Sequence, residues 1–364
     1  LNDNSSGFQE FDTIDWEIED SGRKLLKNSL YIEADVEVYS TTNVKLGLEV
    51  AIGVNNKVGY HAFFESFSCE AKMQNVQNLQ HYPRYVNIVE TTSGNIGTVF
   101  SPMAQAEGRQ CTESGGRYVL QEVKSNGDGT ATQPTSPPGM CIKPKIVFNS
   151  MVGDDYSFNA NGAIRLSTNL ARNGTALYGS QLTGLSSYIL KNIRLKYVTV
   201  PDDGKQGPIM MNSVTSVKQT INSQQANLSV KVPSSAVTGV VVTYISQANE
   251  IGLPNDSYRL EQLPNIDSIE YLFSDSQSRY VTYDVTDQDD MLQKGVDALS
   301  AAGLKVKSNS YMSAGNEGVI HGLDFQQTID LSRNKFGINL RSSSSLMGQN
   351  PRNVYMHFLT IVKL

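Results

Sequence analysis

The chain has 364 residues, of which 39% are hydrophobic and 18% are charged, and its formal net charge is −6. This length suits two domains that each bury a core of their own, without help from disulfides or metal ions. The acidic balance argues against a nucleic-acid-binding surface, which needs a basic face, and the lack of any run of about 18 apolar residues argues against a membrane-spanning helix.

Residues 1–28 do not look like a domain, because acidic and apolar residues are interleaved along them and basic residues follow. The apolar positions are Phe11, Ile14, Trp16 and Ile18. An isolated acidic tail would have no use for these side chains, so one interpretation is an extended N-terminal arm that packs them against a neighbouring subunit. The other is an ordinary edge strand of the first domain, and the sequence favours neither.

Strands begin clearly at residue 30. Apolar residues occupy every second position over 30–38 and again over 44–52, which predicts half-buried antiparallel strands. A hairpin-like unit follows at 62–90, in which a strand pattern leads to a turn at Gln74 and Asn75. A helix is then expected to start at Pro83, because proline is favoured at the first helical position.

Residues 91–139 differ from the rest of the first half, with many Gly, Ser, Thr and Pro residues and one strand-like piece at 117–123. We expect a long surface loop that faces outward, because irregular backbone needs water or a dedicated partner for its polar groups. Residues 125–130 weakly resemble a calcium-binding loop, but carboxylates are lacking where they are required, so a tight hairpin turn is favoured. Strands are expected again at 142–151, 163–167 and 188–200.

Residues 201–208, with two prolines, two glycines and two aspartates, form the best linker in the chain. They separate a first domain at 29–203 from a second at 204–364. Strands of the second domain are expected at 214–222, 227–232, 239–247, 267–274, 279–285, 319–331, 335–341 and 353–363. A helix is expected at 286–303, where apolar residues fall at helical spacing. The predicted fold class is all-β: two tandem jelly-roll, or β-sandwich, domains with one or two short connecting helices.

Motifs for catalysis, cofactor binding or metal binding are nearly absent. The four histidines are scattered and show no metal-ligand spacing, and His357 is expected to be a satisfied core residue. Paired aspartates at 154–155, 202–203 and 289–290 are expected in turns or at the helix start, where their roles are structural. We therefore predict no enzyme activity, no catalytic residues, no cofactor and no metal site.

The cysteines are Cys69, Cys111 and Cys141. An odd and sparse set does not make a disulfide framework. Free thiols are favoured over a bridge between Cys111 and Cys141.

Two segments, one in each half, carry a specific resemblance. They are AFFESFSCEAKMQNVQNLQHYPRYV at 62–86 and LPNIDSIEYLFSDSQSRYVTYDVT at 263–286. Both are similar to the strand pairs that precede the connecting helix in each jelly roll of the double jelly-roll major capsid proteins of the adenovirus and tectivirus lineage. The resemblance covers residues 29–364 and rests on architecture.

The resemblance implies a structural protein of the virion. Its first partners would be two further copies of the chain, in a homotrimer with six roughly equivalent barrels. Neighbouring capsomers of an icosahedral shell and minor capsid proteins would be further partners. The resemblance leaves open whether an internal membrane is also a partner. No direct sequence-specific nucleic-acid binding is implied. Two other classes remain: a glycan-binding adhesin or spike, and a jelly-roll glycosidase or amidase with two carboxylates in a groove between the domains.

Overall fold

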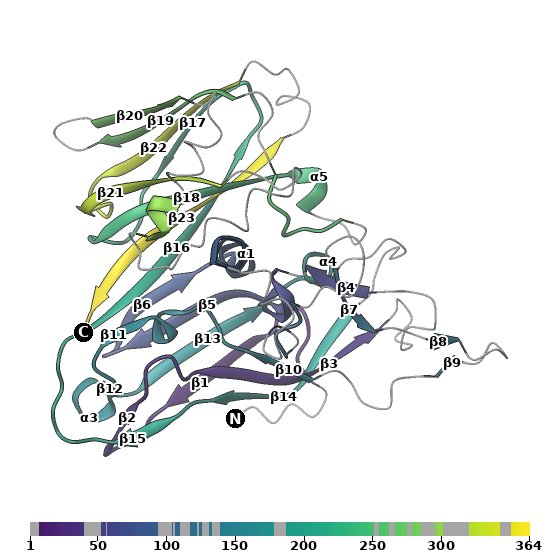
Figure 1. Cartoon of the computed structure of the whole chain (residues 1–364), viewed down its shortest axis with the longest axis vertical. Coiled ribbons are helices and arrows are strands. Elements are labelled where there is room, and N and C mark those ends of the chain that lie inside the picture. The colour runs from purple at the N-terminus through teal and green to yellow at the C-terminus, as the bar shows by residue number, and fades with distance from the viewer. Residues whose placement is uncertain are drawn as a thin grey trace.

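Two β-sandwiches lie side by side in the computed structural model, and the strands β13 (Ile164–Leu170) and β16 (Ile209–Ile221), one from each, both run diagonally in the view of Figure 1. The structure describes residues 7–39, 52–55, 57–93, 104, 106–109, 117–121, 124–125, 131–132, 139–177, 187–250, 255–261, 266–274, 279–284, 294, 296–300, 320–342 and 351–364. Within this part of the chain, strands dominate, as the all-β prediction requires, and no helix is both long and apolar enough to cross a membrane.

The first sandwich packs a four-stranded sheet of order β1-β13-β5-β6 against a three-stranded sheet of order β10-β3-β14. Its other strands are β1 (Thr13–Ile18), β5 (Phe64–Ala71), β6 (Gln74–Leu79), β10 (Gly139–Ile142), β3 (Tyr31–Tyr39) and β14 (Ser187–Lys196). In β3 the buried residues Ile32, Ala34 and Val36 alternate with half-buried ones, which confirms the predicted two-residue period.

Smaller elements lie around the first sandwich. They are the sheet β12-β2-β15, made of β12 (Tyr156–Ser157), β2 (Arg23–Leu25) and β15 (Thr199–Pro201); the pair β4 (Ile52–Asn55) and β7 (Arg117–Gln121); the pair β8 (Lys124–Ser125) and β9 (Ala131–Thr132); the 3-10 helices η1 (Gly59–Phe63) and η3 (Val147–Asn149); and the short helices α3 (Phe158–Asn161) and α4 (Asn173–Ala176). The hairpin predicted around residues 125–130 is thus present as the β8–β9 pair.

The second sandwich packs a five-stranded sheet of order β11-β16-β23-β18-β21 against a four-stranded sheet of order β17-β22-β19-β20. Its other elements are β11 (Met151–Gly153), β23 (Arg352–Lys363), β18 (Val237–Ser246), β21 (His321–Ile329), β17 (Gln225–Val230), β22 (Lys335–Ser342), β19 (Ile266–Ser274), β20 (Arg279–Asp284) and the helix α5 (Gln247–Glu250). Strand β11 comes from the first half of the chain and extends the sheet of the second, so the two sandwiches share a sheet edge.

The terminal strand β23 is buried on both faces, as its nearly continuous apolar sequence predicted. Val354, Met356 and Phe358 point into the core of the second sandwich. On the other face, Leu359 joins the core cluster of the first sandwich and Tyr355 meets its residues. This strand therefore serves two cores at once, which explains why it cannot alternate apolar with polar residues.

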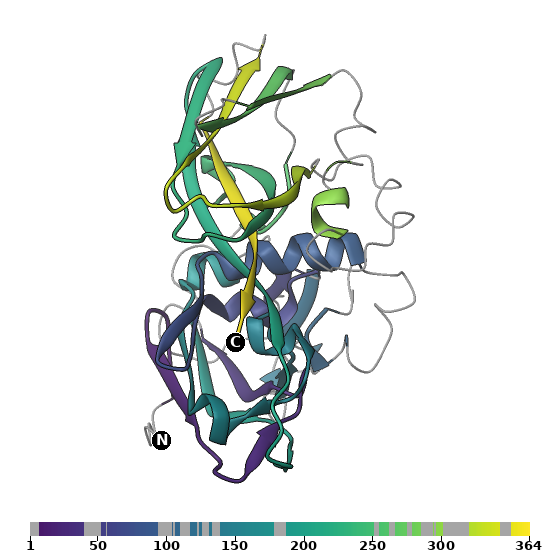
Figure 2. The same cartoon turned by 90° about the vertical axis from the view of Figure 1, so that its left-hand side faces the viewer.

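Helix α1 (Tyr82–Ser93) lies between the two sandwiches in both views (Figures 1 and 2). It begins one residue before the predicted start at Pro83. Its residues from Tyr82 to Val89 are all buried, although Arg84 and Asn87 are among them. A helix buried all round with polar residues needs partners for each of them, and the second sandwich supplies those partners.

Several expectations about local structure were wrong. The first hairpin turns at Lys72 and Met73, whose φ angles are 51° and 58°, and β6 already starts at Gln74. Residues 142–151 do not form one strand, because β10 ends at residue 142 and the 3-10 helix η3 follows.

The expected surface loop at 91–139 is partly buried. Helix α1 extends to residue 93, Ala104 and Glu107 are 0% and 3% exposed, and β7 pairs with β4 rather than within the loop. Of the helix expected at 286–303, the structure describes residues 294 and 296–300, which are helical, and Ala298 and Leu299 are fully buried in the core cluster of the first sandwich.

Candidate functional site

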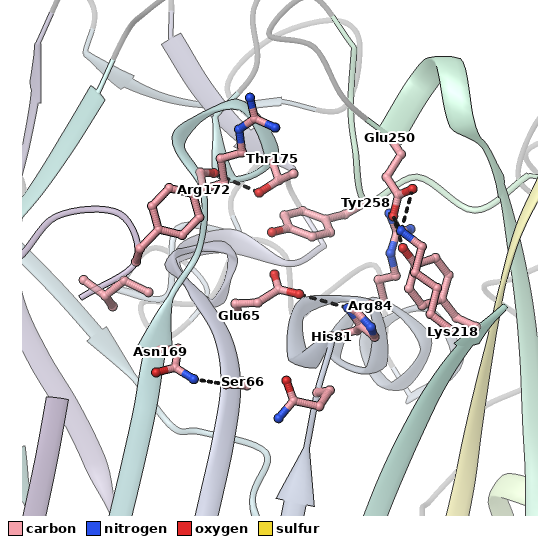
Figure 3. Close-up of a pocket in the computed structure, with 14 residues that line it drawn as sticks. Glu65, Ser66, His81, Arg84, Asn169, Arg172, Thr175, Lys218, Glu250 and Tyr258 are labelled. Atoms are coloured by element: carbon pink, nitrogen blue, oxygen red, sulfur yellow. Dashed lines mark hydrogen bonds and ion pairs between the residues drawn. The ribbon is translucent and has the colours of Figure 1, made fainter. Parts of the chain in front are cut away.

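A cavity of about 460 Å³ lies where α1 and the sheet β1-β13-β5-β6 of the first sandwich face the second sandwich. Charged and aromatic side chains from both halves line it (Figure 3). The first half contributes Glu65, His81 and Arg84, and the second contributes Lys218, Glu250 and Tyr355. The cavity therefore marks the polar part of the contact between the two sandwiches.

Glu250 is the centre of this polar contact. It ends the short helix α5, it is only 8% exposed, and it gathers groups from three elements. Lys218 Nζ lies 2.9 and 3.0 Å from its two carboxylate oxygens, and Arg84 Nη2 lies 3.4 Å from Oε1. The Tyr355 hydroxyl and the Asn353 amide also donate hydrogen bonds to it. A buried carboxylate with this many donors is fully compensated.

Arg84 reaches this carboxylate from α1 across the boundary between the halves. Its guanidinium also donates to the Ser257 carbonyl at 2.7 Å and lies 4.1 Å from the centre of the Tyr355 ring. Burial lowers the pKa of Arg84, and the negative charge of Glu250 opposes that shift. The planar guanidinium suits simultaneous stacking and hydrogen bonding, so lysine would not replace it.

Residues 255–261 of the second half are fastened to the first half by further polar contacts. Asn87 Nδ2 donates to the Tyr258 carbonyl at 2.5 Å, Asn55 Nδ2 donates to Asp256 at 2.5 Å, and the Tyr258 hydroxyl donates to the Ala62 carbonyl at 3.3 Å. Burial raises the pKa of Asp256, and the hydrogen bond from Asn55 partly offsets this shift by lowering the pKa. The contact of Asn87 explains how this polar residue is tolerated on the buried helix α1.

The two carboxylates of the cavity each have basic side chains as partners. Glu65 faces His81, whose Nδ1 is 2.9 Å away, and Glu250 faces Arg84 and Lys218 (Figure 3). A glycosidase instead needs two carboxyl groups that flank a substrate, one of them as a proton donor. Among the described residues, no group of three or more His, Cys, Asp or Glu side chains is arranged to hold a metal ion. The geometry favours a structural junction.

The N-terminal segment divides into buried and exposed positions. Ile14 and Ile18 are 4% and 2% exposed and lie in the core of their own sandwich, and half-buried Trp16 packs against the same core. Strand β1 pairs with β13 over residues 13–18, so this stretch is the edge strand that the sequence offered as the alternative to a free arm. Phe11 differs, because it is 69% exposed at the rim of the cavity.

The remaining candidates have structural surroundings. Asp154 and Asp202 accept hydrogen bonds from the backbone nitrogens of Gly207 and Gly204 at 2.6 and 2.9 Å, while Asp203 pairs with Lys24. The pair at 289–290 lies outside the described residues.

His357 is a core residue, as predicted, but it is only half satisfied. Its Nδ1 lies 2.7 Å from the Ser216 hydroxyl, and its Nε2 has no hydrogen-bond partner in the described part of the chain. Burial lowers its pKa to about 3. Cys69 and Cys141 carry free thiols, and Cys111 lies outside the described residues.

Sequence reasoning missed Arg84 and Glu250. Neither belongs to a motif, and they are far apart in the sequence. The one available signal was an arginine in a helix that is otherwise apolar around it, because such a residue must find a buried partner.

Two jelly rolls in one chain, joined by a shared sheet edge and an interposed helix, match the double jelly-roll fold of viral major capsid proteins. Among solved structures, the chain is similar to the Faustovirus major capsid protein, with a TM-score of 0.65, 10% identity, and 99% of this chain and 88% of that chain covered. For the mavirus major capsid protein the TM-score is 0.53 at 9% identity, and the match covers 97% of this chain and 85% of the mavirus chain. For a chain of the Sputnik virophage the TM-score is 0.55 at 9% identity, and the match covers 98% of this chain and 85% of the virophage chain. No family model matches the sequence, and no curated protein matches it.

Proposed function

We propose that the chain is a major capsid protein, a structural component of a virion. The observation that carries this proposal is the continuity of the likeness: both jelly rolls match, over 99% of this chain and 88% of the Faustovirus protein. A glycan-cleaving enzyme built on jelly rolls would need convergent carboxylates between the domains, whereas in the cavity there Glu65 faces His81 and Glu250 faces Arg84 and Lys218.

The tile of the shell is a homotrimer. Three copies around a threefold axis place six similar sandwiches in a ring, which gives an almost hexagonal outline that neighbouring capsomers can surround. A tile of this kind requires that the two sandwiches of each chain keep one fixed relation. The buried contact of Arg84 with Glu250 and the β11–β16 pairing supply that rigidity. Neighbouring capsomers and minor capsid proteins are the further partners in this proposal.

The two ends of the sandwiches face opposite sides of the shell. The β8–β9 hairpin projects at one end, well beyond β3 and β14 (Figure 1). The small sheet β12-β2-β15 and the end of β23 lie at the other. A projecting hairpin fits the outside, where nothing limits its height, so the paired strands β8 and β9 face outward. Phe11, exposed near the junction, is available to a neighbouring subunit.

Light scattering after size exclusion, combined with electron microscopy, tests the proposal. The expected result is a mass of about 120 kDa, three times the chain mass of 39.9 kDa, and particles of hexagonal outline or closed shells. A monomer at all concentrations would contradict it. Binding of glycans by that monomer would support the adhesin alternative, and glycan or amide turnover would support the enzyme.

A further inference from the structure

The junction contains a reactive combination that a structural role does not require. A lysine amine, a carboxylate and an asparagine amide meet on adjacent elements: Lys218 on β16, Glu250 at the end of α5 and Asn353 on β23. In the β16–β23 register, Thr220 lies opposite Asn353 and Lys218 lies opposite Tyr355. Lys218 and Asn353 therefore project from the same face of the sheet as diagonal neighbours.

One carboxylate oxygen contacts both reacting groups. Lys218 Nζ lies 3.0 Å from Glu250 Oε2, and Asn353 Nδ2 donates a hydrogen bond to the same atom. Because a hydrogen bond spans about 3 Å, the amine and the amide nitrogen lie within about 6 Å of each other. The lysine stem is flexible enough to bring the amine to the roughly 3–3.5 Å at which it can attack the amide carbon.

The amide oxygen is already held by hydrogen-bond donors. Asn353 Oδ1 accepts from the Thr220 hydroxyl at 2.8 Å and from Gln247 Nε2 at 3.2 Å. Negative charge develops on this oxygen when an amine adds to the amide carbon, so the two donors are placed to stabilise it. Asn353 is 2% exposed, which strengthens these interactions and keeps water from the amide carbon.

We propose that Lys218 and Asn353 form an intramolecular isopeptide bond, with Glu250 as the proton carrier. Glu250 takes a proton from the lysine ammonium, and the free amine adds to Cγ of Asn353. The carboxyl proton then passes to Nδ2, the Cγ–Nδ2 bond breaks and ammonia leaves. The second proton of the lysine nitrogen goes to Glu250 and then to the ammonia, which departs as ammonium and leaves the carboxylate as it began. One C–N bond replaces another and no oxidant or reductant is needed. The product ties the C-terminal strand β23 covalently to β16 beside the junction of the two sandwiches.

Another lysine–glutamate pair of the same fold lacks the third component. Lys196 Nζ lies 2.5 Å from Glu33 across the β14–β3 pair. In the described part of the chain, no asparagine amide donates to Glu33. Lys196 therefore provides a matched control, since it has the amine and the carboxylate without an amide to attack.

Intact-mass spectrometry of the full-length denatured chain tests the bond. Loss of ammonia after attack by the amine predicts a mass about 17 Da below that of the sequence. Protease digestion should release one peptide in which Lys218 is joined to position 353. The variants K218R, N353A and E250Q should have the full mass, whereas K196Q should keep the deficit. K218R retains a cation for Glu250 but offers no effective nucleophile, so it is the variant expected to fold like the wild type.

A wild-type chain with the full sequence mass and a native circular-dichroism spectrum would overturn the proposal. A deficit that persists in K218R would do the same, since it would come from another reaction such as cyclisation of an Asn-Gly pair. Electrophoresis gives a second readout, because the linked chain keeps a closed loop between 218 and 353 in detergent and should migrate faster than K218R. The mass readout does not depend on capsid assembly, so it is informative even if the proposed function fails.

Discussion

The two sandwiches share an architecture but differ in how their cores are closed. Among the described residues, the core cluster of the second consists of second-half residues, from Ile221 to Phe358. The core of the first continues across the boundary and includes Ile209, Val241 and Leu359 from the second half. The comparison indicates that the second sandwich has a core of its own, although β11 of the first half extends one of its sheets, whereas the core of the first is completed by its neighbour.

The cores also differ in how they accommodate a buried histidine. In the second sandwich, His321 has a tyrosine hydroxyl on each ring nitrogen, from Tyr244 and Tyr271. In the first, His61 Nδ1 lies 2.6 Å from the Tyr82 hydroxyl, but Nε2 has no partner among the described residues. Since an unsatisfied buried donor costs about 1–3 kcal/mol, the first core again carries the weaker arrangement.

Separating the halves should have the largest effect. We expect residues 209–364 to unfold cooperatively when expressed alone, because their core is complete, and residues 1–208 to lack a cooperative transition, because their core loses its second-half part. Denaturant unfolding followed by near-ultraviolet circular dichroism measures both. A first half that folds by itself while the second does not would reverse the comparison.

The junction should respond strongly to loss of its arginine. Arg84→Ala removes a buried cation whose side chain is 6% exposed and leaves the Ser257 carbonyl and part of the Glu250 charge without a partner. We expect the free energy of unfolding to fall by about 3 kcal/mol, as for other broken buried pairs. Arg165→Ala is the matched control, because its pair with Glu17 is exposed and should be worth less than about 1 kcal/mol. Equal effects of the two substitutions would show that the junction is not specially stabilised by Arg84.

The sequence predicted the class of fold because periodicity is a local signal. Alternation over 30–38 and the continuous apolar run of the last strand corresponded to β3 and β23. Of the predicted linker at 201–208, Pro201 ends β15 and the other residues lie between β15 and β16. Boundaries were less accurate where the chain leaves regular structure. At the first hairpin, Lys72 and Met73 adopt left-handed φ angles, which residues of their type rarely prefer.

The junction could not be predicted in the same way, because its residues are brought together only by tertiary structure. Nothing near Glu250 in the sequence indicates that Arg84 and Lys218 converge on it. The sequence left two interpretations of the N-terminal segment open for a related reason: interleaved acidic and apolar residues describe an edge strand and an extended arm equally well. The pairing with β13 distinguishes them for residues 13–18.

The pH dependence of stability tests the arrangement of the buried histidine in the second core. Burial lowers the pKa of His321 to about 3, below its ordinary value of 6.5, so the unfolded chain binds a proton that the folded chain does not. Stability contributed by this group is therefore lost as pH falls below about 6.5, at roughly 1.4 kcal/mol per pH unit. Between pH 7 and pH 5 the wild type should lose about 2 kcal/mol more than His321→Asn.

Unfolding by urea at the two pH values measures this loss. The variant keeps an amide for the two tyrosines, and His357, whose pKa is also lowered by burial, titrates equally in both proteins and cancels. Identical pH dependence of wild type and variant would show that His321 is not kept neutral by the second core.

The smallest effect on stability is expected from a substitution of Phe11. Comparing this substitution with one at Ile14 separates the effect of the N-terminal segment on folding from its effect on association. Phe11 is 69% exposed with a φ of 69°, whereas Ile14, three residues later, is 4% exposed in the core. Phe11→Ala should change the free energy of unfolding by less than about 0.5 kcal/mol, while Ile14→Ala should cost about 2–4 kcal/mol. If Phe11 contacts a neighbouring subunit, its removal should nevertheless raise the protein concentration needed for the trimer, as measured by light scattering over a dilution series. Unchanged association in Phe11→Ala would leave Phe11 without an inter-subunit role, and a large loss of stability would mean that it packs within its own chain.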